Sequence, residues 1–533
     1  MTINNKVLKV TKIRNTEYYD MTYVFDDLYA KSLKNQKFTN LLEIIQMEEN
    51  IKLAYRNMRK NSGDRTPGID NLTINHINSI CEDEFLRIVK SKMRNYHPKR
   101  VRRVEIPKVN GEMRPLGIPT IWDRIIQQCF LQVLEPICEA KFFERSNGFR
   151  PNRSVENAIA QSYKMMQMYK LHYVVDVDIK GFFDNVNHGK LLKQLWAIGI
   201  RDKRVIAMIS KMLKAEVVMP DKSIVKSEKG ILKKRLNLEI SEDKSKITNL
   251  RKEYSEFLGF KMKVYQKGDK WKVKSHMCDK AYDRTRKELK EAMDVIKDTE
   301  GSANTGRAIS IYNAKVIGIH QYFQLVTMIS EDVSKISYEI QHKCKSRKLE
   351  RRIEQTGRTK QGYIEKIYGA SKQLRYINEV AIAPIGYCKH KNPMYKKKKV
   401  NKYTPEGREL IYKNISVSQT AIQYMLNNPI ENRSIEYNDN RISLYVGQQG
   451  KCAVTGNVLD FYNMHCHHKI PRKMGGTDEY NNIVIVEREV HTLIHAVDEE
   501  VIAKLLGKLS LDKKKLAKLN TLRTKSGNKA INW

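Results

Sequence analysis

Histidines are concentrated between residues 465 and 495, at a spacing that suits metal binding. In this stretch they stand at positions 465, 467, 468, 491 and 495. His491 and His495 are four residues apart, which places both side chains on one face of a helix. In an extended strand, His465 and His467 share one side and His468 faces the other. Because imidazole is the commonest metal-ligand side chain, this stretch is the first candidate for chemistry.

A His-His pair at the end of a strand, an Asn after a Gly-rich turn and His-x-x-x-His on a helix occur here in that order. Together the three parts resemble the HNH endonucleases. The resemblance implies that three histidines hold one metal ion between a hairpin and a helix: His467, His491 and His495. It also implies that His468 is the general base that activates water and that Asn482 orients the loop carrying this base. His465 is the one alternative ligand, and the ion is left open, because Mg²⁺ or another divalent ion is compatible with this site.

Two carboxylates form the second candidate. The run His-Tyr-Val-Val-Asp-Val-Asp-Ile-Lys-Gly-Phe-Phe-Asp-Asn-Val-Asn, which begins at position 172, alternates in its first half as a strand does. Tyr173, Val175 and Val177 face one side, while Asp176 and Asp178 share the other. The apolar residues predict a buried strand that ends in an acid pair. A pair of acids that simply faces water is the plain alternative.

The run Asp-Ile-Lys-Gly-Phe-Phe-Asp that begins at Asp178 resembles the first catalytic motif of reverse transcriptases of the group II intron-encoded type. The resemblance implies that Asp178 holds divalent metal ions, with Mg²⁺ expected, at the primer end. It also implies that Phe182 or Phe183 lies under the nucleotide sugar, and the spacing does not decide which. Lys108 and Arg114 flank a short turn in a second stretch that resembles the family. There the resemblance implies charge-assisted contacts to the phosphates of the incoming nucleotide, and two exposed cations beside a hairpin are the alternative.

The acids that would complete this polymerase site are missing from the sequence. Nucleotide addition is a phosphoryl displacement held by two divalent ions about 3.5–4 Å apart, and one carboxylate cannot fix both ions. The family supplies the rest from a Tyr-x-Asp-Asp hairpin, and the nearest match here, Tyr23 with Asp26 and Asp27, reads as the start of a helix. After Gly230 the chain continues directly with residues that resemble the family's next motif but one, which indicates an internal deletion in the palm. Polymerase activity is expected to be lost or severely impaired, unless Asp176 or a second copy of the chain supplies the acids.

Charge and composition narrow the class of partner. The chain has 98 Lys and Arg against 60 Asp and Glu, a net charge of +38. A surface this basic favours a nucleic acid partner, because binding releases condensed counterions. Eight cysteines without Cys-x-x-Cys spacing predict a reducing compartment, and no apolar run approaches the roughly 20 residues of a membrane span. With no signal-peptide core at the amino terminus, we expect a cytoplasmic protein of bacterial type, associated with the nucleoid or with a ribonucleoprotein.

These residues must be positioned by both helices and strands, and we expect an α+β multidomain protein. The expected parts are right-hand polymerase-like fingers with an incomplete palm, a helical thumb and a small ββα-metal nuclease. In chain order we expect reverse-transcriptase fingers and truncated palm over 1–265, a helical maturase domain over 275–390, a basic DNA-binding linker over 391–440, an HNH endonuclease over 441–500 and a basic tail, helical or disordered, over 501–533.

This order of parts resembles a group II intron-encoded protein. The resemblance implies a protein that binds structured intron RNA to assist splicing and cleaves target DNA during intron mobility. A homodimer is compatible with it. Two alternatives stay open: an active RNA-directed DNA polymerase, and an RNA-binding splicing factor without catalysis.

Overall fold

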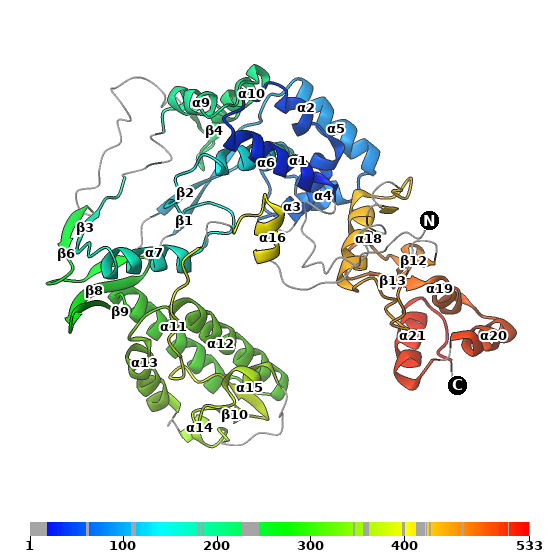
Figure 1. Cartoon of the computed structure of the whole chain (residues 1–533). Coiled ribbons are helices and arrows are strands. Elements are labelled where there is room, and N and C mark those ends of the chain that lie inside the picture. The colour runs from blue at the N-terminus through cyan, green and yellow to red at the C-terminus, as the bar shows by residue number, and fades with distance from the viewer. Residues whose placement is uncertain are drawn as a thin grey trace, which may run out of the picture. The chain divides into compact units, whose positions relative to one another are not determined.

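A computed structural model describes residues 19–59, 63–107, 113–179, 182, 186–225, 245–344, 347–354, 362–396, 400–411, 422, 424–425, 428–459, 463–509 and 511–531. The chain folds into two compact units of mixed α/β structure, shown with their elements labelled in Figure 1. The first unit comprises Met1–Phe142, Phe183–Asn237 and Lys399–Trp533, and the second comprises Phe143–Phe182 and Leu238–Lys398. The segment expected to form fingers and palm, residues 1–265, contributes to both units.

Helices dominate the amino-terminal part of the first unit. They are α1 (Met21–Leu33), α2 (Leu41–Ile45), α3 (Glu48–Arg59), α4 (Ile74–Asn78), α5 (Glu82–Arg94), α6 (Ile121–Glu139), α9 (His188–Ala197) and α10 (Lys203–Leu213). Helix α6 contacts α1, α2, α3 and α5 and forms their common core. It begins after Thr120, whose side-chain oxygen accepts a hydrogen bond from the backbone of Asp123 and so satisfies one open donor of the first turn. Its apolar residues recur at helical spacing and are fully buried at Ile121, Ile125 and Cys129.

One four-stranded sheet belongs to the first unit, in the order β2-β1-β4-β5. Strand β1 (Val101–Pro107) pairs antiparallel with β2 (Met113–Ile118) and parallel with β4 (Val217–Val218). Strand β4 pairs antiparallel with β5 (Ile224–Val225). The turn that joins β1 to β2, including Lys108, lies outside the described residues, and so does the segment around Gly230 where we expect the deletion.

The second unit combines small sheets with a helical bundle. Its sheets are β3 (Tyr173–Asp176) with β6 (Lys246–Asn249), the hairpin strands β7 (Ser255–Phe257), β8 (Phe260–Lys267) and β9 (Lys270–Met277), and β10 (Arg375–Ile377) with β11 (Val380–Ile382). Its helices are α7 (Val155–Gln167), α11 (Asp279–Asp298), α12 (Ser302–Phe323), α13 (Ile329–Cys344), α14 (Arg347–Glu350) and α15 (Tyr363–Tyr368). Buried residues from 155–174 and 250–388 share one hydrophobic core, which includes the helical segment predicted as the maturase domain.

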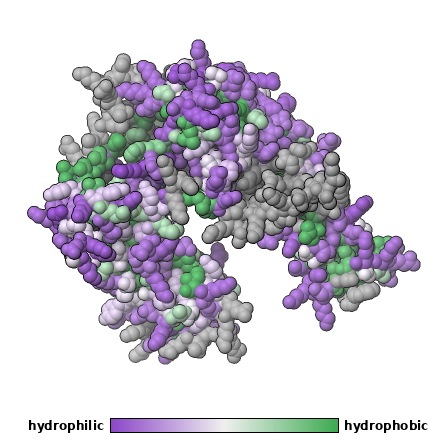
Figure 2. All heavy atoms as spheres, in the orientation of Figure 1, coloured by the Kyte–Doolittle hydropathy of each residue, from purple (hydrophilic) through white to green (hydrophobic). Residues whose placement is uncertain are grey.

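The strand that carries the acid pair is not buried as its pattern predicts. Tyr173, Val175 and Val177 are 69%, 64% and 56% exposed, and Ile247, which pairs with Val175, is 73% exposed. The alternation itself is confirmed, because Val174 packs against the core from the opposite side. In Figure 2 an apolar patch lies over β3 and β6, on a face that is otherwise mostly hydrophilic. The pattern predicts which side is apolar, but burial requires a covering element, and no described residue covers this face.

The carboxyl-terminal part of the first unit contains the histidine-rich stretch. Its elements are α16 (Pro405–Ile411), α18 (Ile435–Gly447), β12 (Met464–His468), the 3₁₀ turn η3 (Arg472–Met474), β13 (Ile483–Glu487), α19 (Arg488–His495), α20 (Glu499–Leu509) and α21 (Lys513–Lys525). The basic tail is helical: Leu506, Leu519 and Leu522 are buried, and α20 and α21 both pack against α19. Among all described helices, none combines the length and apolar character needed to cross a membrane.

Candidate metal centre

The histidines lie on a two-stranded hairpin and the helix that follows it. Strand β12 pairs antiparallel with β13, with His467 opposite Val484 and His468 opposite Ile483. Every residue of β13 is buried, and α19 begins directly after it. Helix α19 buries Val490, Leu493 and Ile494. Its two histidines therefore lie on another face of the helix, which is the arrangement predicted from their spacing of four residues.

Three histidines converge in a group that fits one metal ion. His467, His491 and His495 each offer a ring nitrogen, and these three atoms lie within 4.8 Å of one another. His465 is outside this group, although its ring stacks on that of His491 with centroids 5.0 Å apart. Within the described ranges this is the only such group of His, Cys, Asp or Glu side chains.

The electrostatics of the group favour neutral imidazoles, which is the form that coordinates metal. Burial, together with the neighbouring histidines, lowers the pKa of His467 to about 3 and that of His491 to about 4. The pKa of His495 is also lowered, first by burial and then by Lys473 and Arg523. In neutral solution all three rings are therefore uncharged and need lose no proton before they bind a cation.

The carboxyl-terminal helix α21 and the residues after it complete this centre. Ser526 Oγ donates to the carbonyl oxygen of Lys469 at 3.4 Å and lies 3.3 Å from His467 Nε2. Arg523, only 3% exposed, donates to the carbonyl oxygens of Leu493 and Ala496, the latter at 2.9 Å. Carbonyl groups at the end of a helix have no hydrogen-bond partner within it. Arg523 of α21 therefore satisfies the end of α19, the helix that carries two of the histidines.

His468 has a different environment from the three grouped histidines. Its Nε2 lies 2.8 Å from Asp478 Oδ1, and its ring stacks on Tyr437 with centroids 5.4 Å apart. Burial works to raise the pKa of Asp478, but hydrogen bonds from His468 and Ser434 outweigh it and hold that pKa below its usual value. An ionised carboxylate can only accept a hydrogen bond, so His468 donates one from a protonated Nε2. The other ring nitrogen, Nδ1, is then the atom that can take up a proton.

Asn482 fastens the loop that follows His468. Its Oδ1 accepts from the backbone nitrogen of Ile470 at 2.9 Å, and its Nδ2 donates to the carbonyls of Ile470 at 3.0 Å and Thr477 at 2.8 Å. The loop passes so close to itself that a Cβ on Gly476 would lie 1.8 Å from the carbonyl oxygen of Ile470. Only glycine fits there, and the amide of Asn482 then joins both sides of the loop.

Three residues around this centre escaped the sequence reasoning. Asp478 follows the Gly-Gly turn by only a few positions and carries a usable signal, as an acid inside a motif otherwise assigned residue by residue. Tyr437 lies in α18 and Ser526 directly after α21, both outside the motif. No spacing rule predicts that Tyr437 contacts His468 or that Ser526 contacts His467.

The residues assigned to the polymerase site do not form a metal-binding group in the described part of the chain. The backbone nitrogen of Asp178 donates to Ser245 Oγ at 3.2 Å, and its side chain is exposed. Asp176 Oδ2 accepts from Ser255 Oγ at 3.0 Å. No group of three metal-binding side chains in the described ranges includes either acid.

The remaining predicted nucleotide contacts are placed only in part. Arg114 lies exposed on β2 opposite Ile106, and Phe182 is 44% exposed. Lys108 and Phe183 lie outside the described residues, so their roles stay predictions.

The tyrosine-acid run near the amino terminus is helical, as expected. Tyr23, Asp26 and Asp27 lie in α1. Asp26 pairs with Arg408 at 2.5 Å, and Asp27 pairs with Lys31 at 2.6 Å one helical turn away. This segment is not the missing hairpin.

The arrangement at β12, β13 and α19 can hold a cation, accept a proton from water and fix the loop between these functions. Those are the requirements for metal-assisted hydrolysis of a phosphodiester. Just after β3 the chain presents one exposed carboxylate, that of Asp178, which alone cannot position two metal ions.

Comparisons with known proteins give one family match and several relatives. Residues 106–232 match the family described as "Reverse transcriptase (RNA-dependent DNA polymerase)". The chain is 35% identical over 193 residues to Protein YkfC of Escherichia coli (strain K12), covering 35% of this chain and 50% of that protein. It is 36% identical over 183 residues to the Group II intron-encoded protein LtrA of Lactococcus lactis subsp. cremoris, covering 34% of this chain and 30% of that protein. With Nuclear intron maturase 2, mitochondrial, of Arabidopsis thaliana it shares 34% identity over 113 residues, 21% of this chain and 15% of that protein.

The matched stretches cover half or less of each of these relatives. The family match over residues 106–232 agrees with the resemblance noted in the motifs of that stretch. The chain therefore carries a reverse transcriptase domain and is a relative of the group II intron-encoded proteins and intron maturases.

Proposed function

We propose that the carboxyl-terminal part of this chain is a DNA endonuclease of the HNH type within a group II intron-encoded protein. The observation that carries the proposal is the group of three histidines on a hairpin and a helix, next in sequence to a fourth histidine oriented by a carboxylate. Helix α19 alone offers only two ligands, His491 and His495. The hairpin supplies the third, His467.

The residues divide the work of hydrolysis. His468 Nδ1 takes a proton from water, the water oxygen forms a bond to phosphorus, and the bond from phosphorus to the leaving oxygen breaks. Asn482 holds the loop after His468 in one conformation while this happens. When bound, the metal ion supplies stabilisation of the negative charge on the phosphate and on the leaving oxygen.

The donor set favours some ions over others at this centre. Three neutral imidazoles suit Zn²⁺, Ni²⁺ and related ions, whereas Mg²⁺ prefers oxygen ligands. A single Mg²⁺ held by three histidines would need water or phosphate oxygens for its remaining positions. We therefore propose a divalent transition metal at the histidines, and Mg²⁺ at the carboxylates of any polymerase site.

The partners we propose are structured intron RNA and target DNA. The net charge of +38 supports a polyanion partner, and the names of two relatives connect those proteins with introns. In this proposal the protein assists splicing of its intron RNA and cuts DNA during intron mobility, and its reverse-transcriptase activity is lost or severely impaired. An active polymerase that completes its metal site with other acids is the second candidate, favoured by the match over residues 106–232.

The test of the nuclease is cleavage of a supercoiled plasmid by the full chain. We expect nicked and linear products with Mn²⁺, Ni²⁺ or Zn²⁺, complete inhibition by EDTA and recovery when the metal is added back in excess. Cleavage that survives EDTA and dialysis would contradict a metal-dependent HNH centre.

A further inference from the structure

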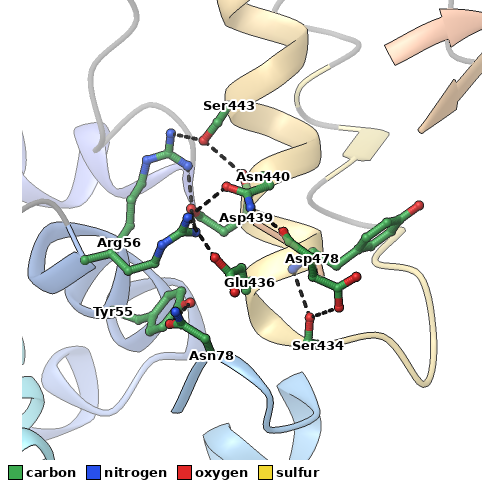
Figure 3. Close-up of polar contacts among 11 residues, drawn as sticks. Tyr55, Arg56, Asn78, Ser434, Glu436, Asp439, Asn440, Ser443 and Asp478 are labelled. Carbon is green, nitrogen blue, oxygen red and sulfur yellow. Dashed lines mark hydrogen bonds and ion pairs between the residues drawn. The ribbon is translucent and has the colours of Figure 1, made fainter. Parts of the chain in front are cut away.

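Helix α18 packs one side of its surface against helix α3 through a buried ionic network (Figure 3). Arg56 Nη1 donates to Asp439 Oδ1 at 2.6 Å and its Nη2 donates to Ser443 Oγ at 2.7 Å. Arg59 donates to Asp439 Oδ2 at 3.2 Å and lies 3.1 Å from Glu436 Oε1. Arg56 and Asp439 are 1% and 5% exposed, so this contact is a rigid part of the fold rather than a surface ion pair.

The same helix holds Asp478 on its other side. Ser434, which precedes α18, donates from Oγ to Asp478 Oδ2 at 2.5 Å. Asn440 Nδ2 donates to the carbonyl oxygen of Asp478 at 2.7 Å, while Asn440 Oδ1 accepts from Arg59 at 3.1 Å. Asn440 is 1% exposed and therefore ties Arg59 on α3 directly to the backbone of Asp478.

We propose that Asp478 is the positioning residue of His468, and that α18, braced on α3, is the support that holds Asp478 in place. The inference rests on the nuclease function proposed above and adds to it the residues that set the orientation of the base.

Chemistry explains why this support matters. His468 is the last residue of β12, and a two-stranded hairpin alone is only marginally stable, so the strand by itself does not fix the imidazole ring. The carboxylate of Asp478 selects the ring form protonated on Nε2, and Tyr437 of α18 stacks against the ring. One helix thus supplies both the stacked ring and the anchors of the carboxylate, so the angle and the proton of His468 are set together.

The first experiment removes the charge of Asp478 in the full chain. Asp478→Asn should lower kcat for plasmid cleavage about 10- to 100-fold, the range typical of an outer hydrogen-bond partner, with KM for DNA and the Kd for Zn²⁺ unchanged. Asp221→Asn is the control. Asp221 accepts a hydrogen bond from the backbone nitrogen of Ser223 at 2.9 Å in an exposed turn outside the histidine-rich part of the chain, so it reports the loss of a hydrogen-bonded carboxylate that does not touch His468.

The second experiment asks whether Asp478 acts through His468. In single-turnover reactions with excess enzyme, Asp478→Asn should have no further effect in the His468→Ala background, because the group it orients is gone. Multiplied losses in the double variant would show an independent structural role and would overturn the inference. Ser434→Ala, which removes only one bond to the carboxylate, should give a smaller loss of kcat and covers the case in which Asp478→Asn does not fold.

The third experiment tests the support on α3. Arg59→Ala should lower kcat several-fold without changing the Zn²⁺ affinity, and Arg59→Lys, which keeps the charge but not the forked geometry, should restore only part of it. Arg87→Ala is the control, because Arg87 forms an exposed pair with Glu84 on α5 at 3.3 Å. If Arg59→Ala cleaves at the rate of the Arg87→Ala control, α3 is not part of the support.

These outcomes separate the inference from the proposed function. Absence of metal-dependent cleavage in the unaltered chain, or unchanged cleavage by His468→Ala, would refute the nuclease function itself. Loss of cleavage in His468→Ala together with full cleavage in Asp478→Asn would leave the nuclease standing and refute only the role of Asp478.

Discussion

Two neighbouring histidines on β12, His467 and His468, have different surroundings because a strand turns successive side chains to opposite sides. His467 joins His491 and His495, and burial lowers its pKa to about 3. His468 instead meets a carboxylate and a tyrosine ring. These different neighbours support the roles proposed for them, ligand for His467 and base for His468, and substitutions should separate the two roles.

The first prediction at this scale concerns the base. His468→Ala should abolish multiple-turnover DNA cleavage, leaving only a residual rate in single-turnover reactions, and should leave metal affinity nearly intact, because it removes the proton acceptor and no ligand. Plasmid cleavage and calorimetric titration with Zn²⁺ on the same preparation measure both properties. Normal cleavage by His468→Ala would mean the role is misassigned, and His467 would then be tested as the base.

A second prediction separates the ligand group from its neighbour. His491→Ala should weaken Zn²⁺ binding by more than the roughly 10- to 100-fold loss expected for an outer partner, because it removes a direct ligand. His465→Ala is the matched control: it removes a stacked imidazole that lies outside the group and should bind Zn²⁺ nearly as well as the unaltered chain. Equal losses in the two variants would show that His465 also coordinates the ion.

Local periodicity explains how much of the site was predictable. The pairing of His491 with His495 follows from the 3.6-residue helical repeat, and the separation of His467 from His468 follows from the two-residue repeat of a strand. Asp478, Tyr437 and Ser526 depend on the path of a loop and on the packing of helices far away in the chain. No rule of spacing contains that information, so these contacts became visible only in the fold.

At the scale of elements, the tail illustrates the same limit. The sequence left residues 501–533 as a basic helix or a disordered arm, whereas the structure packs α20 and α21 against α19. The leucines predicted an apolar stripe but not its partner. The strand β3 shows the converse: its apolar pattern predicted burial, yet Val175 is 64% exposed because no described element covers it.

The prediction at this scale is that the tail stabilises the metal centre. Arg523→Met should destabilise the protein by about 2–3 kcal/mol, because buried carbonyls at the end of α19 lose a charged donor, and should weaken Zn²⁺ binding. Thermal unfolding with and without Zn²⁺ measures both effects. Lys518→Met on the same helix is the control, since Lys518 is exposed and forms no described hydrogen bond to α19. Equal Zn²⁺ affinity in the two variants would remove the tail from the centre.

At the scale of the whole molecule, the feature that bears on the proposed nucleic-acid partners is charge. The excess of basic residues, 98 against 60, is spread along the sequence. Surfaces of this kind bind nucleic acid largely through released counterions. The electrostatic part of the affinity for nucleic acid should therefore fall as the salt concentration rises. The affinity that remains at high salt should report structure-specific recognition.

The fourth prediction measures this dependence. Affinity for a structured intron RNA should fall by about 10³–10⁵ between 50 and 200 mM salt if six to ten phosphates are contacted. Fluorescence anisotropy across a salt series gives the slope, and a scrambled RNA of equal length gives the part of the affinity that charge alone supplies. A flat salt response, or equal binding of heparin at all salt concentrations, would contradict recognition of RNA.

The last prediction concerns synthesis by the reverse transcriptase domain. Primer extension on an RNA template should be undetectable or far below nuclease activity, because two ions are needed to stabilise the charge that develops during nucleotide addition. No group of three metal-binding side chains in the described ranges includes Asp178, and Asp176, the last residue of β3, accepts a hydrogen bond from Ser255. Inserting a Tyr-x-Asp-Asp segment from a close relative after Gly230 should bring synthesis back, and Asp178→Ala in that restored chain should remove it. Template-dependent synthesis by the unaltered chain that disappears in Asp178→Ala would instead show that other acids complete the site.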